Sequence, residues 1–517
     1  MTFEIVFVLL SLLGMMAALI ADKMRPGMVL FSVVVLFLCV GILTPKEMLE
    51  GFSNKGMITV ALLFLVSEGI RQSGTLGQVI KKLLPQGKTT VFKAQLRILP
   101  SVAFISAFLN NTPVVVIFAP IIKHWAKSVK LPATKFLIPL SYVTILGGIC
   151  TLIGTSTNLV VHGMILEAGY EGFTMFELGK VGIFIAIAGI IYLFIFSKRL
   201  LPDARPDTAV PDEEVEEGEK LHRVEAVLGA RFPGINKKLS DFNFQRHYGA
   251  EVKEIKTRNG QRYVDHLEDV VLREGDTLVV MADDTFIPTW GESSVFVLLT
   301  NGNDPDTSGK KKRWLALILL VLMIVGATVG ELPATKEMFP DIMLDIFFFV
   351  CITTIIMAWT NIFPARKYTK YISWDILITI ACAFAISKAM VNSGVADCVA
   401  GFIIGLSDDY GPHVLLAILF VITNLFTELI TNNAAAALAF PLALSISAQL
   451  GVSPTPFFVV ICMAASASFS TPIGYQTNLI VQGIGNYKFT DFVRIGLPLN
   501  IITFLISVIL IPLIWNF

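Results

Sequence analysis

Two groups of small polar residues interrupt apolar stretches of this chain. The first group contains Asn110-Asn111-Thr112 and, further along, Gly154-Thr155-Ser156-Thr157-Asn158. The second contains Asn432-Asn433-Ala434 and then Gly474-Tyr475-Gln476-Thr477-Asn478. Amide and hydroxyl oxygens are ligands for hard cations, and oxygens without formal charge suit a monovalent cation best. The residue types therefore predict cation binding at both groups.

The two groups are copies of one pattern. Ser73-Gly74, before the first group, is matched by Ser393-Gly394 before the second, and Pro132 is matched by Pro454. A polar pattern that occurs twice within membrane-length apolar segments is typical of a duplicated transporter whose binding site lies between the two copies.

The composition is that of an integral membrane protein. Of the 517 residues, 54% are hydrophobic and 15% charged, and the mean hydropathy is +0.72. The first apolar run is not expected to be a cleaved signal peptide, because Met1-Thr2-Phe3-Glu4 has no basic residue. Apolar runs long enough to cross the hydrocarbon core recur along the chain: Ile5–Ile20, Val29–Ile42, Val181–Phe196, Trp314–Val329, Ile342–Trp359 and Leu497–Ile514.

No residue pattern supports catalysis. The six cysteines are scattered without a CxxC or Cys/His cluster, and the sequence has no Ser/His/Asp arrangement or glycine-rich phosphate loop. We expect no catalytic residues, no enzyme, no organic cofactor, no metal other than sodium and no nucleic-acid partner.

A hydrophilic segment separates the two polar groups. We divide it into an acidic linker (201–220), a compact α/β domain (221–300) and a basic linker (301–313). Short strand-like stretches between Gly, Asn and Asp turns support the domain: Leu221–Leu228, Val252–Ile255, Thr277–Met281 and Val295–Leu299.

The charges of the loops predict the orientation. Basic residues fill the connection Arg71–Arg97, whereas Gly163–Gly179 and Val391–His413 carry several acidic residues. The positive-inside rule places the basic connections and the α/β domain in the cytoplasm and the amino terminus outside. The sides assigned to these loops are consistent with one another only if each Asn motif lies at the tip of a re-entrant hairpin.

The predicted fold is therefore an all-α polytopic membrane protein with two inverted repeats, residues 1–200 and 314–517. Each repeat has five transmembrane helices and one hairpin, and the small cytoplasmic α/β domain is inserted between them. Gly154–Asn158 and Gly474–Asn478 are poor helix interiors, so they are expected to be unwound breaks facing the hairpin tips. Helix N-termini that point at the centre would favour an anion between two cation sites.

The repeats resemble the divalent-anion/sodium symporters, which carry dicarboxylates, citrate or sulfate. The resemblance implies sodium and substrate binding, elevator-type movement, a homodimer and a place in the cell inner (plasma) membrane. The Asn-Asn-Thr and Asn-Asn-Ala tips depart from the family's Ser-Asn-Thr pattern. The hydroxyl missing at Ala434 argues against a dicarboxylate and keeps sulfate or another small oxyanion open. The resemblance implies two half-sites: Asn110, Asn111, Thr112, Ser156, Thr157 and Asn158 in one, and Asn432, Asn433, Ala434, Gln476, Thr477 and Asn478 in the other.

The hydrophilic domain resembles the C-terminal ligand-binding subdomain of TrkA-type potassium-transport regulators. The matching stretches are Tyr248–Val252 and Leu272–Val280. The resemblance implies a small regulatory ligand. Because many sulfur-related members of the symporter family carry such an insertion, it also favours sulfate.

Two other functions stay open. An arsenite-type or cation/proton exchanger of the same superfamily would need an intramembrane carboxylate, and Glu428, close to the second tip, is the candidate for coupling. The third possibility is a sensor that reports the availability of an anion through the hydrophilic domain.

Overall fold

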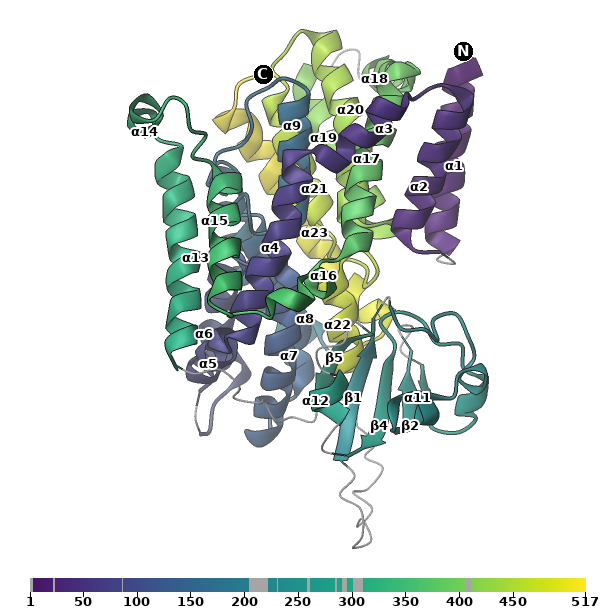
Figure 1. Ribbon diagram of the computed structural model, residues 1–517, viewed down its shortest axis with the longest axis vertical. Helices are drawn as coiled ribbons and strands as arrows, with labels where there is room; N and C mark the ends of the chain where they lie inside the picture. Colours follow the sequence, from purple (N-terminus) through teal and green to yellow (C-terminus); the bar gives the residue numbers. More distant parts are fainter. Residues whose placement is uncertain are drawn as a thin grey trace, which may run out of the picture.

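A computed structural model of the chain describes residues 3–21, 24–85, 87–203, 222–229, 231–257, 261–283, 286–290, 295–300, 310–405 and 411–517. The acidic linker, except for 201–203, and residues 301–309 of the basic linker lie outside these ranges. Figure 1 shows a helical body with a small sheet domain below it.

The helical body consists of two sets of helices on either side of the sheet domain in sequence. The first set is α1 (Phe3–Ala21), α2 (Pro26–Val40), α3 (Pro45–Glu50), α4 (Lys55–Gln72), α5 (Thr75–Leu83), α6 (Val91–Ser106), α7 (Asn111–Ser128), α8 (Leu137–Gly148), α9 (Ser156–Glu167) and α10 (Gly179–Leu200). The second is α13 (Lys310–Gly330), α14 (Pro333–Met338), α15 (Ile346–Trp359), α16 (Tyr368–Tyr371), α17 (Trp374–Asn392), α18 (Val395–Gly405), α19 (Gly411–Leu429), α20 (Asn432–Leu450), α21 (Thr455–Ser466), α22 (Gln476–Gly485) and α23 (Phe489–Ile514).

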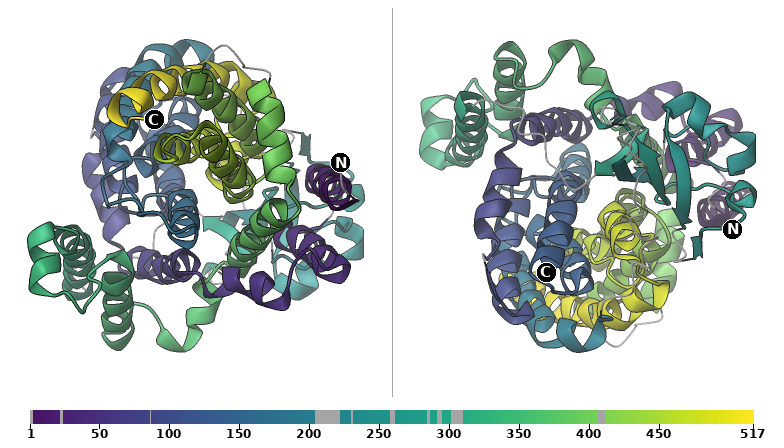
Figure 2. Two further views of the ribbon diagram at one scale, coloured as in Figure 1. Left: turned by 90° about the horizontal axis from the view of Figure 1, so that it is seen from above. Right: turned by 90° about the horizontal axis from the view of Figure 1, so that it is seen from below.

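The two sets interlock. Helix α2 packs on α17, α4 on α15, α7 on α22, α9 on α20 and α10 on α23. Seen from above and below, α13–α15 and α1–α2 lie on different flanks of a central group formed by α7–α10 and α19–α23 (Figure 2). Buried apolar side chains of both sets form one continuous core.

The helical content agrees with a polytopic membrane protein. Among the described residues, eight helices are long and apolar enough to cross a membrane. One predicted run begins too early, because the helix expected from Ile342 starts at Ile346. The carboxylate of Asp345 accepts a hydrogen bond from the Phe348 amide (3.1 Å) and caps the helix there.

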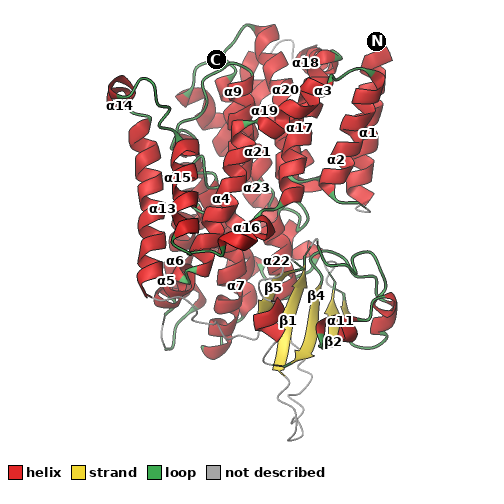
Figure 3. Ribbon diagram, in the orientation of Figure 1, coloured by secondary structure: helices red, strands yellow, loops and turns green. Residues whose placement is uncertain are grey.

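The sheet domain has its own apolar core and lies at one end of the helices (Figure 3). Its five strands are antiparallel in the order β3-β2-β4-β1-β5. Four lie within one residue of the predicted stretches, whereas β3 was not predicted because a two-residue strand has no periodicity to detect. The strands are β1 (His222–Leu228), β2 (Glu251–Lys256), β3 (Arg262–Tyr263), β4 (Thr277–Ala282) and β5 (Phe296–Thr300), accompanied by the short helices α11 (Phe244–Tyr248) and α12 (Phe286–Trp290).

Two helix pairs are interrupted where the sequence predicts breaks. Residues 149–155 separate α8 from α9, and residues 467–475 separate α21 from α22. Unwinding frees backbone carbonyls that must find donors in a low-dielectric interior. The Asn158 amide donates to the Thr151 carbonyl (2.9 Å), and the Asn478 amide donates to the Ser468 carbonyl (2.9 Å). These amides therefore stabilise the breaks.

Candidate functional site

Four helix N-termini meet in the centre of the helical body. They are the first residues of α7, α9, α20 and α22, namely Asn111, Ser156, Asn432 and Gln476. Each N-terminus presents backbone amides without helical partners and carries partial positive charge. The two groups of polar residues at these N-termini contain no charged side chain. Such a junction favours an anion at its centre without a fixed positive residue.

The tip before α7 contacts the opposite half through its side chains. The Asn111 amide donates to the hydroxyl of Tyr475 (2.6 Å), which also lies 2.9 Å from the Thr155 hydroxyl. The Thr112 hydroxyl donates to the side-chain amide oxygen of Gln476 (3.4 Å). The first tip is thus linked to both helix breaks.

The tip before α20 makes the reciprocal contact. The side-chain amide oxygen of Asn433 accepts hydrogen bonds from the hydroxyls of Ser156 (3.3 Å) and Thr157 (3.2 Å). Asn433 and Thr157 are buried, whereas Ser156 is half-buried. The polar residues of the two halves therefore form one connected cluster.

Each tip contacts the break of its own half chiefly through backbone carbonyls. The Thr151 hydroxyl donates to the Ala107 carbonyl, and the Thr471 hydroxyl donates to the Glu428 carbonyl (3.1 Å). The two predicted half-sites are brought together in this way.

The remaining predicted residues lie within the same region: Asn110 is half-buried, Asn158, Thr477 and Asn478 are fully buried, and Gln476 is exposed.

The hydrogen bonds correct the alignment of the two tips by one residue. The Ser106 hydroxyl donates to the side-chain amide oxygen of Asn111, five residues later (2.8 Å). The Thr427 hydroxyl donates in the same way to the side-chain amide oxygen of Asn432, again five residues later (2.9 Å). Asn432 therefore occupies the position of Asn111, not that of Asn110. Ala434 is then not the counterpart of Thr112, because Asn433 takes that place. Ala434 therefore marks no missing hydroxyl at the second tip and gives no reason to doubt a dicarboxylate.

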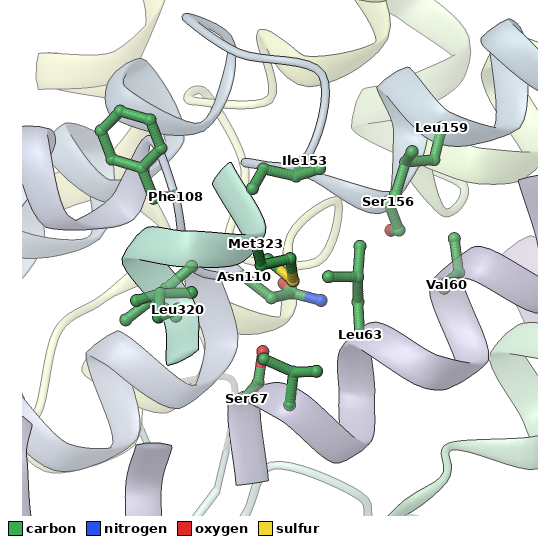
Figure 4. A pocket seen from close by; sticks show the side chains of 12 residues that line it. Val60, Leu63, Ser67, Phe108, Asn110, Ile153, Ser156, Leu159, Leu320 and Met323 are labelled. Carbon is green, nitrogen blue, oxygen red and sulfur yellow. The ribbon is translucent and has the colours of Figure 1, made fainter. Parts of the chain in front are cut away.

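A small pocket lies beside the first tip. It has a volume of about 10 Å³, close to the minimum that holds one water molecule. Asn110, Ser156 and Ser67 of α4 supply its polar side chains, and Leu320 and Met323 of α13 close it (Figure 4). The pocket joins two predicted residues to two helices that carry no predicted residue.

Several site residues were not predicted. Tyr475 and Thr155 lie inside the polar motifs but are not among the predicted ligands, although the hydrogen bond between their hydroxyls joins the two halves. Ser67 carries no motif signal, and only its place on the pocket identifies it. Ser141 of α8 donates to Asn478 (2.6 Å) and is likewise an isolated serine in an apolar run.

The sheet domain contacts two helices that carry the site. The Lys123 ammonium of α7 donates to both carboxylate oxygens of Glu225 on β1 (2.9 Å each). The turn before β4 packs on α22, where Gly275 lies against Leu479. Burial raises the pKa of the Glu225 carboxyl, but the charges of Lys123 and Lys256 outweigh it and lower that pKa below its ordinary value. The ion pair is therefore formed at neutral pH.

Comparison with known proteins gives consistent matches. The citrate transporter family matches residues 16–446 and 334–517. An uncharacterized transporter of Synechocystis sp. is 29% identical over 94% of this chain and 93% of its own length. A putative sulfur deprivation response regulator of Chlamydomonas reinhardtii is 28% identical over 93% of this chain and 96% of its own. A probable sodium/sulfate cotransporter 3 of the same alga is 32% identical over 54% of this chain and 31% of its own.

The family match spans both sets of helices, and the apolar helices agree with a multi-pass membrane protein. The matched family and two of the three relatives above are transport proteins by name. The chain belongs to the citrate transporter family and is a membrane transport protein rather than an enzyme.

Proposed function

We propose that this protein imports a small divalent anion, sulfate in preference to a dicarboxylate, by secondary active transport coupled to sodium. The observation that carries the proposal is the meeting of four helix N-termini whose motifs contain no charged side chain. The similarity to a probable sodium/sulfate cotransporter supports both the anion and the coupling ion.

In this proposal the anion lies between the four N-termini. Its oxygens would accept hydrogen bonds from backbone amides at the starts of α7, α9, α20 and α22. Hydroxyls of Ser156 and Thr112, both half-buried at the junction, are the side chains best placed to add donors. The helix dipoles replace a fixed cation, so the site can release the anion after transport.

Sodium would bind at each tip. Asn110 and Ser156 line the pocket beside the first tip, and their amide and hydroxyl oxygens are the proposed ligands there. Asn432 and Asn433 supply amide oxygens at the second, opposite Thr157. Neutral oxygens are common ligands of monovalent ions because the net charge of the site stays low.

The proposed topology is that of two inverted repeats, 1–200 and 314–517, whose hairpins α6–α7 and α19–α20 enter the membrane from opposite sides. Its support is the repetition of matched hydrogen bonds at both tips and both breaks. The domain 221–300 would then lie in the cytoplasm between its linkers. The resemblance to the sodium symporters supports our assignment of the protein to the cell inner (plasma) membrane.

A cysteine-labelling experiment tests this orientation. With the exposed cysteines Cys39 and Cys398 replaced by serine, a cysteine at Glu171 is expected to react with an impermeant thiol reagent in intact cells. A cysteine at Lys253, exposed on the sheet domain at the other end of the molecule, is expected to react only after the cells are opened. The reverse pattern would contradict the orientation and both hairpin assignments.

Alternating access would come from elevator-type movement. The moving bundle would contain the hairpins, the broken helices and α10 and α23, which pack on one another. Helices α1, α2, α13 and α15 have no polar interruption and form the scaffold. Many apolar side chains of α1 and α13 are exposed, which supports a homodimer or lipid contact along this scaffold.

The sheet domain would regulate transport through its contact with α7 and α22. A groove of about 810 Å³ beside β2, lined among others by Asn243, Glu251 and His266, is the candidate site for a small regulatory ligand. A ligand bound there can shift access only by its different affinity for the two transport states.

Removing the domain tests this role. Deletion of Glu213–Asp306 with a flexible bridge is expected to leave uptake but to change its response to cellular conditions in a graded way, by about 5-fold to 150-fold. Glu225→Gln, which breaks the Lys123 contact, is expected to give part of the same change. Lys237→Gln, at an exposed position of the same domain that does not line the groove, is the matched control. A deleted protein that inserts normally but never transports would contradict a purely regulatory role.

An anion sensor is the second candidate, because one full-length relative is named a putative sulfur deprivation response regulator. Transport by purified protein separates the two functions. Uptake of radiolabelled sulfate into proteoliposomes, with and without a sodium gradient, is the test, and a sensor without transport activity would show none.

A further inference from the structure

Glu428 lies in a joint between three elements of the second repeat. One of its carboxylate oxygens, Oε1, accepts hydrogen bonds from the Ser470 backbone amide (2.8 Å) and from the Asn500 side-chain amide (2.7 Å). The same Asn500 amide donates to the Ser470 hydroxyl (2.8 Å). The carboxylate, the hydroxyl and the amide thus belong to α19, the 467–475 break and α23.

Two oxygens of this joint lack a partner. Glu428 Oε2 and Asn500 Oδ1 are both buried and have no partner at hydrogen-bonding geometry, although the amide and hydroxyl of Thr471 lie close to the Glu428 carboxyl. Asn500 is only 6% exposed. In the part of the chain that the structure describes, no Lys, Arg or His lies within ion-pair distance of Glu428. Glu428 is half-buried as a residue, but a carboxylate whose free oxygen is buried without a counter-charge is costly, so the joint lacks a positive group.

The first repeat makes the same joint without these oxygens. Thr151 donates to the Ala107 carbonyl as Thr471 donates to the Glu428 carbonyl, so Ala107 occupies the position of Glu428. Cys150, directly before Thr151, likewise takes the position of Ser470.

The third position follows from two glycines that touch the breaks. A Cβ on Gly182 of α10 would lie 2.6 Å from the Ile149 carbonyl, and Gly496 of α23 packs in the same way on the Phe469 carbonyl. Four residues later come Ala186 and Asn500. The first repeat therefore has Ala107, Cys150 and Ala186 where the second has Glu428, Ser470 and Asn500.

This difference argues against a purely architectural role. A hairpin tip docks on a helix break in the first repeat with no carboxylate and no amide at the joint, so the packing does not require them. A polar trio that only one of two matched joints contains, with two oxygens left over, indicates a ligand.

We propose that Glu428, Ser470 and Asn500 hold a further sodium ion, one that the first repeat does not bind. Glu428 Oε2, Asn500 Oδ1 and the Ser470 hydroxyl are the oxygen ligands. A proton would occupy only one of the two unpartnered oxygens, whereas a metal cation can coordinate both. The ion balances the charge of Glu428 and makes the number of coupled cations larger than two tip sites provide.

This site rests on the proposed sodium coupling, so its test has a readout besides transport. In purified protein, sodium is expected to raise the melting temperature, measured against choline at equal ionic strength. Glu428→Gln and Asn500→Ala are expected to weaken sodium binding, so that the sodium concentration for half-maximal stabilisation rises by at least about tenfold. In proteoliposomes the same variants are expected to lower the Hill coefficient for sodium by about one while some uptake remains.

Asn424→Ala is the matched control. Asn424 lies on the same helix and donates to the Ala467 carbonyl of the same break (2.5 Å), but it is not a proposed ligand. It is expected to keep the wild-type sodium dependence. Wild-type sodium titrations in both Glu428→Gln and Asn500→Ala would overturn the site. So would a loss of pH dependence with unchanged sodium dependence, because the occupant would then be a proton. A wild-type protein that is stabilised by sodium through Glu428 but takes up no anion would contradict the transport proposal alone.

Discussion

Asn111→Ala and Asn433→Ala are each expected to reduce sodium-coupled uptake by about a hundredfold or more. Each amide is buried at a tip and bonded to the opposite half, Asn111 to Tyr475 and Asn433 to Ser156 and Thr157. Removing Asn111 leaves the buried Ser106 hydroxyl without its partner, and removing Asn433 does the same to the buried Thr157 hydroxyl. Each loss costs about 1–3 kcal/mol, and the upper end of that range corresponds to about a hundredfold. Initial rates of uptake over a range of sodium concentrations, up to saturation, measure the effect.

The control for these variants is Asn392→Ala. The Asn392 amide donates to the Ile42 carbonyl (3.1 Å), far from both tips, so its loss tests the general effect of removing an interhelical amide. All three proteins should elute as single species in gel filtration. Wild-type sodium dependence in either tip variant would contradict the two-tip account.

Gly154→Ala and Gly474→Ala are expected to abolish uptake. A Cβ at Gly154 would lie 2.5 Å from the Gly148 carbonyl oxygen and 2.9 Å from that of Ala107, distances that Cβ atoms do not adopt. A Cβ at Gly474 would collide with the Thr427 carbonyl and the Ser468 hydroxyl. In each half the added methyl group would separate the tip from its break. The cation ligands on the two elements would then no longer face one another.

Gly14→Ala serves as the matched control, because a Cβ at Gly14 in α1 meets no atom within 4 Å. Alanine in a helix interior should stabilise α1 by about 0.5–1 kcal/mol. Uptake and the melting temperature are measured for all three variants. Normal uptake by Gly154→Ala and Gly474→Ala would mean that close contact between tip and break is not needed.

The sequence predicted the features that follow from residue type and repetition. The breaks at Gly154 and Gly474 could be predicted because glycine, threonine and asparagine are poor helix formers within apolar runs. The strands β1, β2, β4 and β5 could be predicted from short β-branched stretches between turn residues. Both signals are local and need no knowledge of the packing.

The features that could not be predicted depend on contacts between distant segments. The correct pairing of Asn111 with Asn432 follows from the bonds to Ser106 and Thr427, since the sequence has Asn-Asn at both tips and either alignment reads equally well. Ser67 joins the site only because α4 packs beside the first tip. The ion pair of Lys123 with Glu225 joins segments that no periodicity relates.

The most direct test of the proposed function is uptake of radiolabelled sulfate and succinate by purified protein in proteoliposomes. An inward sodium gradient is compared with equal potassium on both sides. The proposal predicts sodium-dependent sulfate accumulation that exceeds succinate accumulation and disappears in Asn433→Ala. Equal uptake with and without the sodium gradient, or accumulation of succinate but not sulfate, would contradict it.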